Sequence, residues 1–395
     1  MPALAQPIRE RARHVGCCQR ALEAVRRHEN HGRHNPRIAD PATADTTYAL
    51  NDEQLSFREV VRQIAQERVA PRAAEIDEKA EYPHDLRKLL AEQDILGLPF
   101  DEEHGGTGTG TLTLNIAVEE LAKACASTAL ILMVQELGSL PIKLFGSEEL
   151  KQRYLPRLAS GEWTPAFALS EVEAGSDPGG MRTRALRDGD DWIINGEKNW
   201  ITNLGIADLF VVFAVTDPEQ GHSRGISAFV VERDWPGVSI GKLEHKMGIR
   251  GSPTGQPVFS DVRVPGGNLI GAEGEGFKVA LSTLDRSRLG VAAQGLGLAQ
   301  GATDFAAAYA KERRQFGKPI IGFQGIQFKL ADMETSCAAA RELLYKACAK
   351  VDRGEPDMGK YSAMAKLFCS DTAMAVTTEA VQVLGGYGYV KEYPV

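Results

Sequence analysis

The sequence predicts an α+β multidomain protein with an N-terminal helical domain, a central antiparallel β-domain and a C-terminal four-helix-bundle domain lacking its last helix. Apolar residues recur at helical spacing in the first and last thirds of the chain. The middle third consists of short runs rich in Val, Ile and Phe, bounded by Gly, Pro and Asp. We place the three domains at 48–165, 166–272 and 273–395, after an extension of residues 1–47.

The composition allows several hydrophobic cores and excludes some classes of protein. The chain has 395 residues, of which 43% are hydrophobic, enough for two or three domains. Its net charge of −8 argues against non-specific nucleic-acid binding. No uninterrupted run of apolar residues is long enough for a membrane span, so we expect none. The six cysteines lack metal-ligand or disulfide-framework spacing and are expected to be idle thiols in a reducing compartment.

Residues 1–44 differ from the rest of the chain, being rich in Arg and His, poor in acids, and free of Lys and Ser. An Arg-rich, acid-poor start is typical of an organelle transit peptide, but the lack of Ser and the presence of Glu10, Glu23 and Glu29 argue against one. A disordered or spurious extension, a targeting segment and a functional arm all remain open. We expect a bacterial cytoplasmic location, or the mitochondrial matrix if the segment is a transit peptide.

The N-terminal helical domain begins near Tyr48. Asn51 and Gln54 form a capping-box pattern before a run of apolar residues at helical spacing. Apolar residues then dominate from 111 to 143, which predicts buried helices. Ser147 is predicted to cap a further helix, because a serine side chain can accept a hydrogen bond from a free N–H of the first turn.

The next region predicts a β-domain. The stretch DWIINGEKNWIT contains Asn195-Gly196, a strong hairpin signal, so we expect two short strands around it. The runs ADLFVVFAV, GISAFVVER, PGVSIGKL and TGQPVFSDVRV predict further strands.

From Gly276 onward, three long helical patterns joined by short loops predict a bundle. A four-helix bundle needs one more helix than these patterns supply. An apolar stripe on the last of the three is therefore expected to be partly uncovered, and it consists of Met364, Leu367, Phe368, Val376 and Val381.

Three motifs each allow a chemical and a purely structural interpretation. FALSEVEAGSD, which starts at Phe167, offers hydroxyls and backbone N–H groups to a polar ligand, or forms a plain turn. In NWITN, Trp200 either stacks on a flat cofactor beside Thr202 or lies in the core. In LDRSR, Asp285 and Arg288 share a helix face, as a surface ion pair or as a site for a phosphate or amide-rich ligand. Three Gly clusters lie outside any strand–turn–helix unit, so no Rossmann site is expected.

Taken together, these motifs resemble the acyl-CoA dehydrogenases. The resemblance covers about 48–395 and is carried, in order, by FALSEVEAGSD, NGEKNWITN, HKMGIRGSPT, LDRSR, RRQFGKPI with FQGIQFKLADM, and AVQVLGGYGY. It implies one FAD per subunit between the β-domain and the bundle, usually in a homotetramer. It also implies dehydrogenation of an acyl-CoA thioester in fatty acid or amino acid catabolism, by abstraction of the α-proton and transfer of the β-hydride to flavin N5. Electrons would pass to an electron-transfer flavoprotein.

The resemblance further implies which residues form the sites. Ser176, Asp285 and Arg288 would hold the acyl-CoA, and no metal is expected. Arg313, Gln324 and the turn from Gln382 would reach the FAD of a neighbouring subunit. The full set implied to bind FAD is Phe167, Ala168, Leu169, Ser170, Ser176, Trp200, Ile201, Thr202, Arg313, Phe316, Gln324, Gln382, Val383, Leu384, Gly385 and Gly386.

The catalytic base is where the chain departs from the family pattern. In most members the base is a Glu in a YEGT-like stretch, which would fall beyond Val395. In a minority it stands on the LDxxR helix, where this chain has Ser287. We therefore expect no catalytic residue in these 395 residues and a C-terminally truncated chain. Glu136 and Asp285 are other acids, for which a structural or ligand-holding role is expected.

The sequence leaves alternatives open for the acyl substrate and for the function of the protein. The region near 127–137 is expected to line the acyl pocket, and the uncharged Ser127, Thr128 and Leu130 favour a short or branched aliphatic acyl group over a dicarboxylic one. An acyl-CoA oxidase that uses O₂ and a catalytically inactive scaffold with the same fold are the alternatives to a dehydrogenase.

Overall fold

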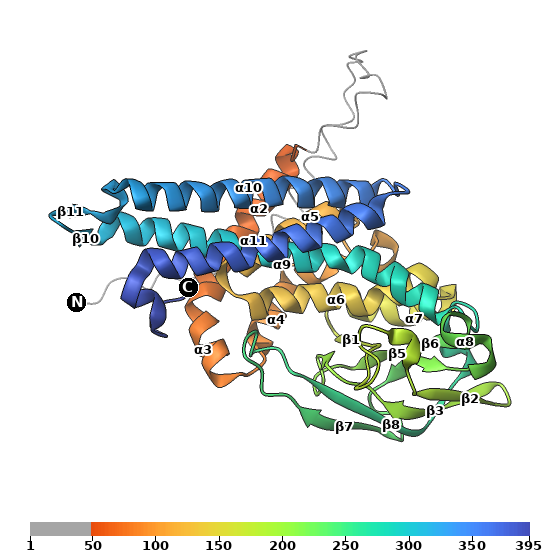
Figure 1. Cartoon of the computed structure of the whole chain (residues 1–395). Coiled ribbons are helices and arrows are strands. Elements are labelled where there is room, and N and C mark those ends of the chain that lie inside the picture. Colours follow the sequence, from red (N-terminus) through yellow and green to blue (C-terminus); the bar gives the residue numbers. More distant parts are fainter. Residues whose placement is uncertain (1–48) are drawn as a thin grey trace, which may run out of the picture. The chain divides into compact units, whose positions relative to one another are not determined.

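The computed structural model describes residues 49–395, and its elements are labelled in Figure 1. The chain divides into two units, Met1–Phe57 and Arg58–Val395, and the packing described below is that of the second. The predicted extension of residues 1–47, with its two cysteines, lies outside the described residues. The other four cysteines are free and buried.

The capping box at the start of α2 (Asp52–Ile64) is confirmed. The Asn51 N–H donates to Gln54 Oε1 at 3.2 Å, and the Gln54 N–H donates to Asn51 Oδ1 at 2.8 Å. Two orphan N–H groups of the first turn are satisfied in this way.

The region that follows is helical, as predicted. Ser147 caps α7, since its Oγ accepts the Leu150 N–H at 3.2 Å. The elements are the turns Ala65–Val69 and Ala70–Arg72, α3 (Ala73–Lys79), α4 (His84–Glu92), the turns Ile95–Gly97 and Glu102–His104, α5 (Gly110–Ala124), α6 (Ala126–Phe145) and α7 (Glu148–Ala159).

Helix α6 qualifies the expectation of no membrane span. By length and composition α6 is apolar enough to cross a membrane, although Glu136 and Lys143 interrupt its apolar run. Inside the protein, 72% of its apolar window is buried. Burial of this extent is typical of the core helix of a folded domain.

The β-domain is a single sheet with the strand order β4-β8-β3-β2-β5-β6-β9, to which β1 adds beside β5 and β7 beside β8. Most pairs are antiparallel, as predicted, but β1 and β2 each pair with β5 in parallel. The strands are β1 (Pro165–Ala168), β2 (Arg184–Asp188), β3 (Asp191–Glu197), β4 (Ile201–Thr202), β5 (Leu209–Val215), β6 (Ile226–Glu232), β7 (Val238–Leu243), β8 (Thr254–Val264) and β9 (Leu269–Ile270). The short helices of this region are Pro178–Gly180, Pro218–Gln220, α8 (Gly221–Arg224) and Gly266–Asn268.

The predicted hairpin at Asn195-Gly196 is wrong. Strand β3 runs through both residues, and the chain turns instead at Gly189, between β2 and β3. Gly196 has a φ of 148° at a register shift against β8. A Cβ there would lie 2.5 Å from Thr183 Oγ1. Gly196 is therefore needed for a β-bulge that packs closely against its neighbour. The Asn-Gly dipeptide alone does not show whether its glycine lies in such a bulge or in a turn.

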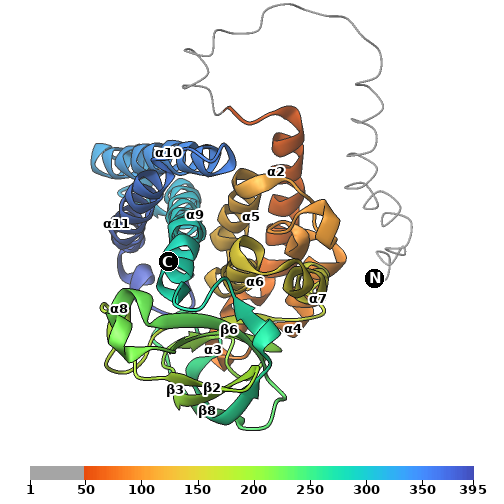
Figure 2. The ribbon, with the colours of Figure 1, turned by 90° about the vertical axis from the view of Figure 1, so that its right-hand side faces the viewer.

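Three long helices form the C-terminal part: α9 (Gly276–Glu312), α10 (Gln324–Asp352) and α11 (Met358–Leu384). The small hairpin of β10 (Arg314–Gln315) and β11 (Lys318–Pro319), with the turn Ile320–Gly322, joins α9 to α10, and the turn Gly385–Tyr389 follows α11. Figure 2 shows α9 between α11 on one side and α5 with α6 on the other, which agrees with the packing of α9 against all three.

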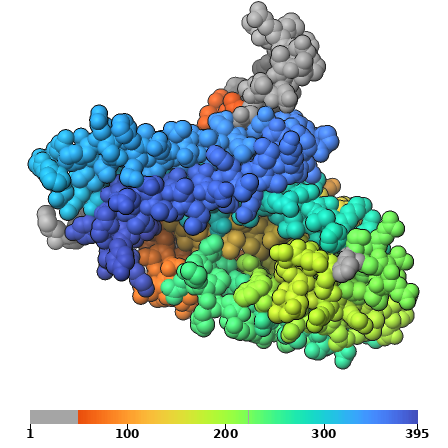
Figure 3. All heavy atoms as spheres, viewed as in Figure 1, coloured from red at the N-terminus to blue at the C-terminus, as the bar shows by residue number. Residues whose placement is uncertain are grey.

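One face of α11 is uncovered in the part of the chain that the structure describes. Figure 3 shows α11 running along the surface, and the predicted residues Met364, Leu367 and Phe368 are exposed. The prediction is wrong for Val376, which is buried. Val376 stands four residues after the buried Thr372 and four before the buried Ala380, so it shares their inward face.

Helix α10 is tied to α5 at two places along its C-terminal half. The Asp352 carboxylate accepts the Thr111 N–H at 2.7 Å and the Leu112 N–H at 3.1 Å. It thereby satisfies free N–H groups at the start of α5. Nearer the middle, the buried Glu119 of α5 accepts the Arg341 Nε–H at 2.9 Å and the Tyr345 hydroxyl at 2.8 Å.

Candidate functional site

The residues predicted to bind a cofactor fall into two separate groups. Leu169 packs in the same hydrophobic core as Val279 and Ala280, near the start of α9. Arg313 follows the end of that helix, roughly 50 Å further along its axis at 1.5 Å per residue. We call the first group the β-domain site, which consists of Phe167–Ser170, Ser176 and Trp200–Thr202. We call the second group the bundle-end site, which consists of Arg313, Phe316, Gln324 and Gln382–Gly386.

Two segments meet in the β-domain site, one following β1 and the other following β3. The Asn199 N–H donates to the Ser170 carbonyl at 2.8 Å. The Lys198 ammonium donates to the Leu169 carbonyl at 3.1 Å and to Glu171 Oε1 at 2.8 Å. Three consecutive residues of one segment are therefore held by two consecutive residues of the other.

The ion pair between Glu171 and Lys198 is buried. Glu171 also accepts the Arg182 N–H at 2.6 Å and the Thr183 N–H at 3.0 Å. Burial by itself would raise the pKa of Glu171, but Lys198 and these N–H donors outweigh it and hold that pKa below its ordinary value. Burial lowers the pKa of Lys198 to about 8, against the opposing effect of Glu171. Both groups are therefore charged at neutral pH.

Sequence reasoning missed Glu171, Lys198 and Asn199, although all three lie inside motifs that it singled out. Lys198 directly follows β3 and lies beyond the register shift at Gly196, so the alternation of buried and exposed residues along β3 did not predict its burial. A buried lysine needs a buried partner.

Trp200 does not lie in the core, so the core interpretation of this residue is wrong. Its side chain is 59% exposed and its φ is 62°. Such a φ is an outlier for a bulky residue and costs roughly 1–2 kcal/mol. Asn199 Oδ1 accepts the Trp200 N–H at 3.0 Å and supports this conformation. Next to it, Ile201 is buried and Thr202 is half-buried, paired with Thr254 of β8.

The other members of the β-domain site differ in what they expose. Phe167 is half-buried against Phe213, with ring centroids 5.0 Å apart. Ala168 and Leu169 are buried, so only their backbone can reach a ligand. Ser170 is half-buried and Ser176 is exposed, and neither hydroxyl makes a hydrogen bond to another described residue.

Asp285 and Arg288 form an ion pair on α9, which confirms their predicted shared face. The Asp285 carboxylate also lies beside the start of α11, because a Cβ on Gly359 would be 3.3 Å from it. Arg288 keeps about a third of its side chain exposed. Ser287 lies between them in sequence and is half-buried.

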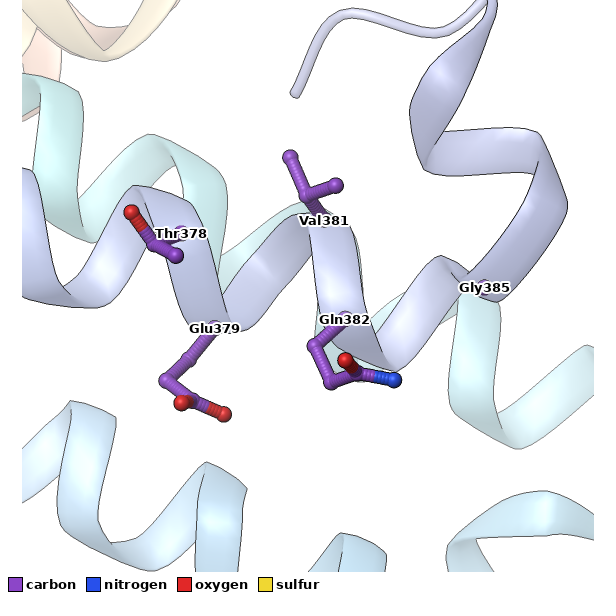
Figure 4. Close-up of a pocket in the computed structure, with 5 residues that line it drawn as sticks. All are labelled: Thr378, Glu379, Val381, Gln382 and Gly385. Atoms are coloured by element: carbon purple, nitrogen blue, oxygen red, sulfur yellow. The ribbon is translucent and has the colours of Figure 1, made fainter.

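The bundle-end site contains a cavity of about 390 Å³ beside the last turns of α11. Figure 4 shows the side chains of Glu379 and Gln382 projecting on one side of α11 and that of Val381 on the other. Glu379 is paired with Lys329 of α10, whereas Gln382 is exposed. The cavity is lined by Thr378, Glu379, Val381, Gln382 and Gly385.

The turn after α11 presents open backbone. Gly385 has a φ of 61°, and no atom lies within 4 Å of a Cβ built on Gly385 or on Gly386. A ligand can therefore approach both residues closely. Val383 and Leu384, in contrast, are buried and belong to the core.

Residues from three other elements complete the bundle-end site. The Arg313 guanidinium lies over the ring of Tyr387, 5.4 Å from its centroid, which joins the end of α9 to the turn after α11. Phe316 is 92% exposed in the β10–β11 hairpin, with a φ of 49°. Gln324 is exposed at the first position of α10.

Glu136 is a buried carboxyl of a different kind. It is 5% exposed, and its carboxyl makes no hydrogen bond to any residue that the structure describes. Its Oε2 lies 3.8 Å from the position of a Cβ built on Gly290 of α9. Burial raises the pKa of Glu136 to about 8, although Lys143 and Arg286 act to lower it. The carboxyl is therefore mostly neutral at pH 7.

Two further features contain none of the predicted residues. A cavity of about 570 Å³ lies between α8 and the loop before α9, lined by three acids, Arg224 and small polar residues. Asp101, Glu103 and His104 bring possible metal-ligand atoms within 4.8 Å of one another. Lys143 already donates to Asp101 at 3.1 Å, so we assign no metal to this group.

Comparison with known protein families gives a consistent result along the chain. The acyl-CoA dehydrogenase N-terminal domain matches residues 51–162, the middle domain matches 166–262, and the C-terminal domain matches 274–395. A probable acyl-CoA dehydrogenase of Mycobacterium tuberculosis is 48% identical over 348 residues, which are 88% of this chain and 89% of that protein.

Solved structures agree with this result. Butyryl-CoA dehydrogenase from Megasphaera elsdenii has a TM-score of 0.86 at 45% identity, over 88% of this chain and 92% of the other. A chain from a study of the electron transferring flavoprotein of Acidaminococcus fermentans has a TM-score of 0.86 at 44% identity, over 88% and 92%. A glutaryl-CoA dehydrogenase from Mycobacterium smegmatis in complex with FADH₂ has a TM-score of 0.81 at 33% identity, over 87% of each chain.

Proposed function

Because the chain belongs to the acyl-CoA dehydrogenase family of oxidoreductases, we propose that it binds FAD and dehydrogenates an acyl-CoA thioester between Cα and Cβ. The observation that carries this proposal is the β-domain site, where an exposed Trp200 is held in a strained conformation by bonds between two segments. Strain of this kind persists where the surrounding structure imposes it, and it concentrates at ligand sites. The FADH₂ complex of a relative supports the choice of cofactor.

The residues of the β-domain site fit a flavin. The exposed ring of Trp200 offers a flat face for stacking, and the half-buried Thr202 offers a hydroxyl at the edge of that surface. Ser170 and Ser176 offer hydroxyls without other partners among the described residues. Bound FAD would supply the acceptor for the β-hydride. These residues would orient the acyl-CoA against it and exclude water from the reacting carbons.

We assign the acyl-CoA to Ser176 and to the Asp285–Arg288 pair. The partly exposed Arg288 guanidinium keeps N–H donors free for an anionic or amide-rich group, while Asp285 holds its orientation. On α6, Ser127 and Thr128 are uncharged and buried, which favours a short or branched aliphatic acyl group. The likeness to a butyryl-CoA dehydrogenase supports the same size class.

Proton abstraction requires a carboxylate base, and α9 does not supply one. Ser287 stands at the position where a minority of the family carries a Glu, and a hydroxyl is too weak a base for an α-proton beside a thioester. Asp285 is paired with Arg288, so we assign the base to no residue of α9, and the proposed dehydrogenation depends on a carboxylate that this helix does not hold.

We assign the bundle-end site to the FAD of a neighbouring copy of the chain. Its open glycines, exposed Gln382 and exposed Phe316 all face outward, roughly 50 Å along α9 from the β-domain site. A homotetramer satisfies this arrangement. The likeness to a chain studied with an electron transferring flavoprotein supports that class of protein as the electron acceptor. A bacterial cytoplasmic location and the domain boundaries 48–165, 166–272 and 273–395 belong to the same proposal.

The test is FAD binding by the purified chain, measured by isothermal titration calorimetry and the visible spectrum. We expect Trp200→Ala to raise the Kd for FAD about tenfold, the loss of one stacking contact of roughly 1.4 kcal/mol. Leu186→Ala is the control, because Leu186 is similarly exposed on β2 and outside both sites. Absence of FAD binding by the unmodified chain, or equal binding by the two variants, would overturn the proposal.

A further inference from the structure

The buried ion pair of Glu171 and Lys198 has partners on both sides of the β-domain site. The Lys198 ammonium donates to the Leu169 carbonyl in the segment after β1. In its own segment, Lys198 directly precedes Asn199, which bonds to Ser170, and Trp200. We propose that this ion pair is a positioning device for the flavin, which sets the register between the segment after β1 and the segment after β3. The inference rests on the proposed flavin site and adds two residues that do not themselves contact the cofactor.

Directed bonds distinguish this pair from ordinary packing. Lys198 is fully buried, and the Glu171 side chain is 8% exposed. Glu171 uses one oxygen for Lys198 and the Thr183 N–H and the other for the Arg182 N–H. An apolar pair of the same volume would fill the space without specifying which residues lie opposite each other. Buried polar groups are best attested in the role of setting register.

The pair controls both edges of the site. Glu171 and Ala174 exchange two backbone hydrogen bonds of 3.1 Å and 3.2 Å, which closes the turn that leads to Ser176. Asn199 donates to Ser170 and supports the strained Trp200. A shift of either segment by a fraction of an ångström would therefore move Ser170 and Trp200 relative to each other. Ligand sites tolerate only about 0.5 Å of such movement.

A second ion pair in the same domain offers a matched comparison. Lys242 and Glu244 on and beside β7 are also 2.8 Å apart, but the Lys242 side chain is 65% exposed. Neither side chain of this pair makes a hydrogen bond to a residue of the β-domain site as the structure describes it. The two pairs therefore share their domain and their N–O distance and differ in burial and location.

The experiment compares Lys198→Met, Glu171→Gln and the control Lys242→Met in the full chain. FAD affinity is measured by titration, the environment of the bound flavin by the shape of its visible absorption band, and folding by circular dichroism. We expect Lys198→Met and Glu171→Gln to fold at low temperature, to raise the Kd for FAD about tenfold or more, and to broaden the flavin band. Lys242→Met is expected to match the unmodified chain in all three measurements.

The outcomes separate the two proposals. If the unmodified chain binds no FAD, the flavin site itself is wrong. If the unmodified chain binds FAD and the folded Lys198→Met and Glu171→Gln variants bind it equally well with an unchanged band, only the positioning role is overturned. If both variants unfold at all temperatures tested, the pair serves stability alone, and the positioning role is overturned as well.

Discussion

Glu171 and Glu136 are two buried carboxyls in different surroundings. Glu171 lies between two segments of the β-domain and accepts hydrogen bonds from Lys198 and two backbone N–H groups. Glu136 lies between α6 and α9 and accepts none from the residues described. Burial acts to raise the pKa of both, yet only the pKa of Glu136 ends above its ordinary value, at about 8. Partners, and not depth, decide which buried carboxyl stays charged.

The same substitution at both positions is the strongest test of this comparison. Glu171→Leu leaves a buried ammonium and two N–H groups without an acceptor, so we expect it to lower the free energy of unfolding by about 3–5 kcal/mol. Glu136→Leu removes no hydrogen bond and keeps a similar volume, so we expect a change within about 1 kcal/mol, or stabilisation. Urea denaturation at pH 7, followed by circular dichroism, measures both. Equal losses at the two positions would break the comparison.

The pH dependence of stability sharpens the same comparison with a somewhat smaller effect. The folded state keeps Glu136 protonated up to about pH 8, whereas the unfolded state ionises it above its ordinary pKa of 4.5. The unfolded state therefore binds fewer protons in this window, and the contribution of Glu136 to stability falls as pH rises from 4.5 to 8. We expect a loss of about 2–4 kcal/mol from pH 5 to pH 8, at up to 1.4 kcal/mol per unit.

Glu136→Gln should lack this part of the pH dependence, because its amide does not titrate. The measurement is the urea midpoint at several pH values from 5 to 8. Glu162→Gln, at an exposed position, is the control and should keep the slope of the unmodified chain. A slope in Glu136→Gln equal to that of the control would show that Glu136 is charged in the folded state.

The smallest expected effect concerns backbone strain beside the Glu171–Lys198 pair. Trp200→Gly removes a side chain that is 59% exposed and relieves a positive φ, so we expect stability to change by less than about 1 kcal/mol, toward stabilisation. Asn203→Gly is the matched variant, with a φ of 69°, but its Nδ2 donates to the buried Pro165 carbonyl at 2.9 Å. We expect it to lose about 1 kcal/mol. Thermal unfolding of both variants measures whether the lost hydrogen bond of Asn203 lowers stability by more than the relief of its positive φ raises it.

Local patterns in the sequence predicted the elements of the fold well. The capping box at Asn51, the cap at Ser147 and the apolar runs of β5, β6 and β8 depend on neighbouring residues alone. The role of Gly196 could not be predicted locally, because it depends on Thr183, which directly precedes the adjacent strand β2. Val376 was misread because the direction of a helix face depends on what packs against it.

The candidate site was predictable in part. The motif residues could be singled out because they lie in conspicuous stretches of the chain, and their assignment to a cofactor stays a prediction. The Glu171–Lys198 pair was missed because its members are 27 residues apart and meet only through the sheet. The exposure of Trp200 could not be predicted from its apolar character, since its left-handed backbone turns it outward.

The cap that Asp352 provides for α5 has a consequence for synthesis of the chain. Thr111 emerges from the ribosome 241 residues before its acceptor does. At about 5–20 residues per second, the N–H groups at the start of α5 wait roughly 12–48 seconds for their carboxylate. The first turn of α5 therefore takes its final partner only after most of the chain has been translated.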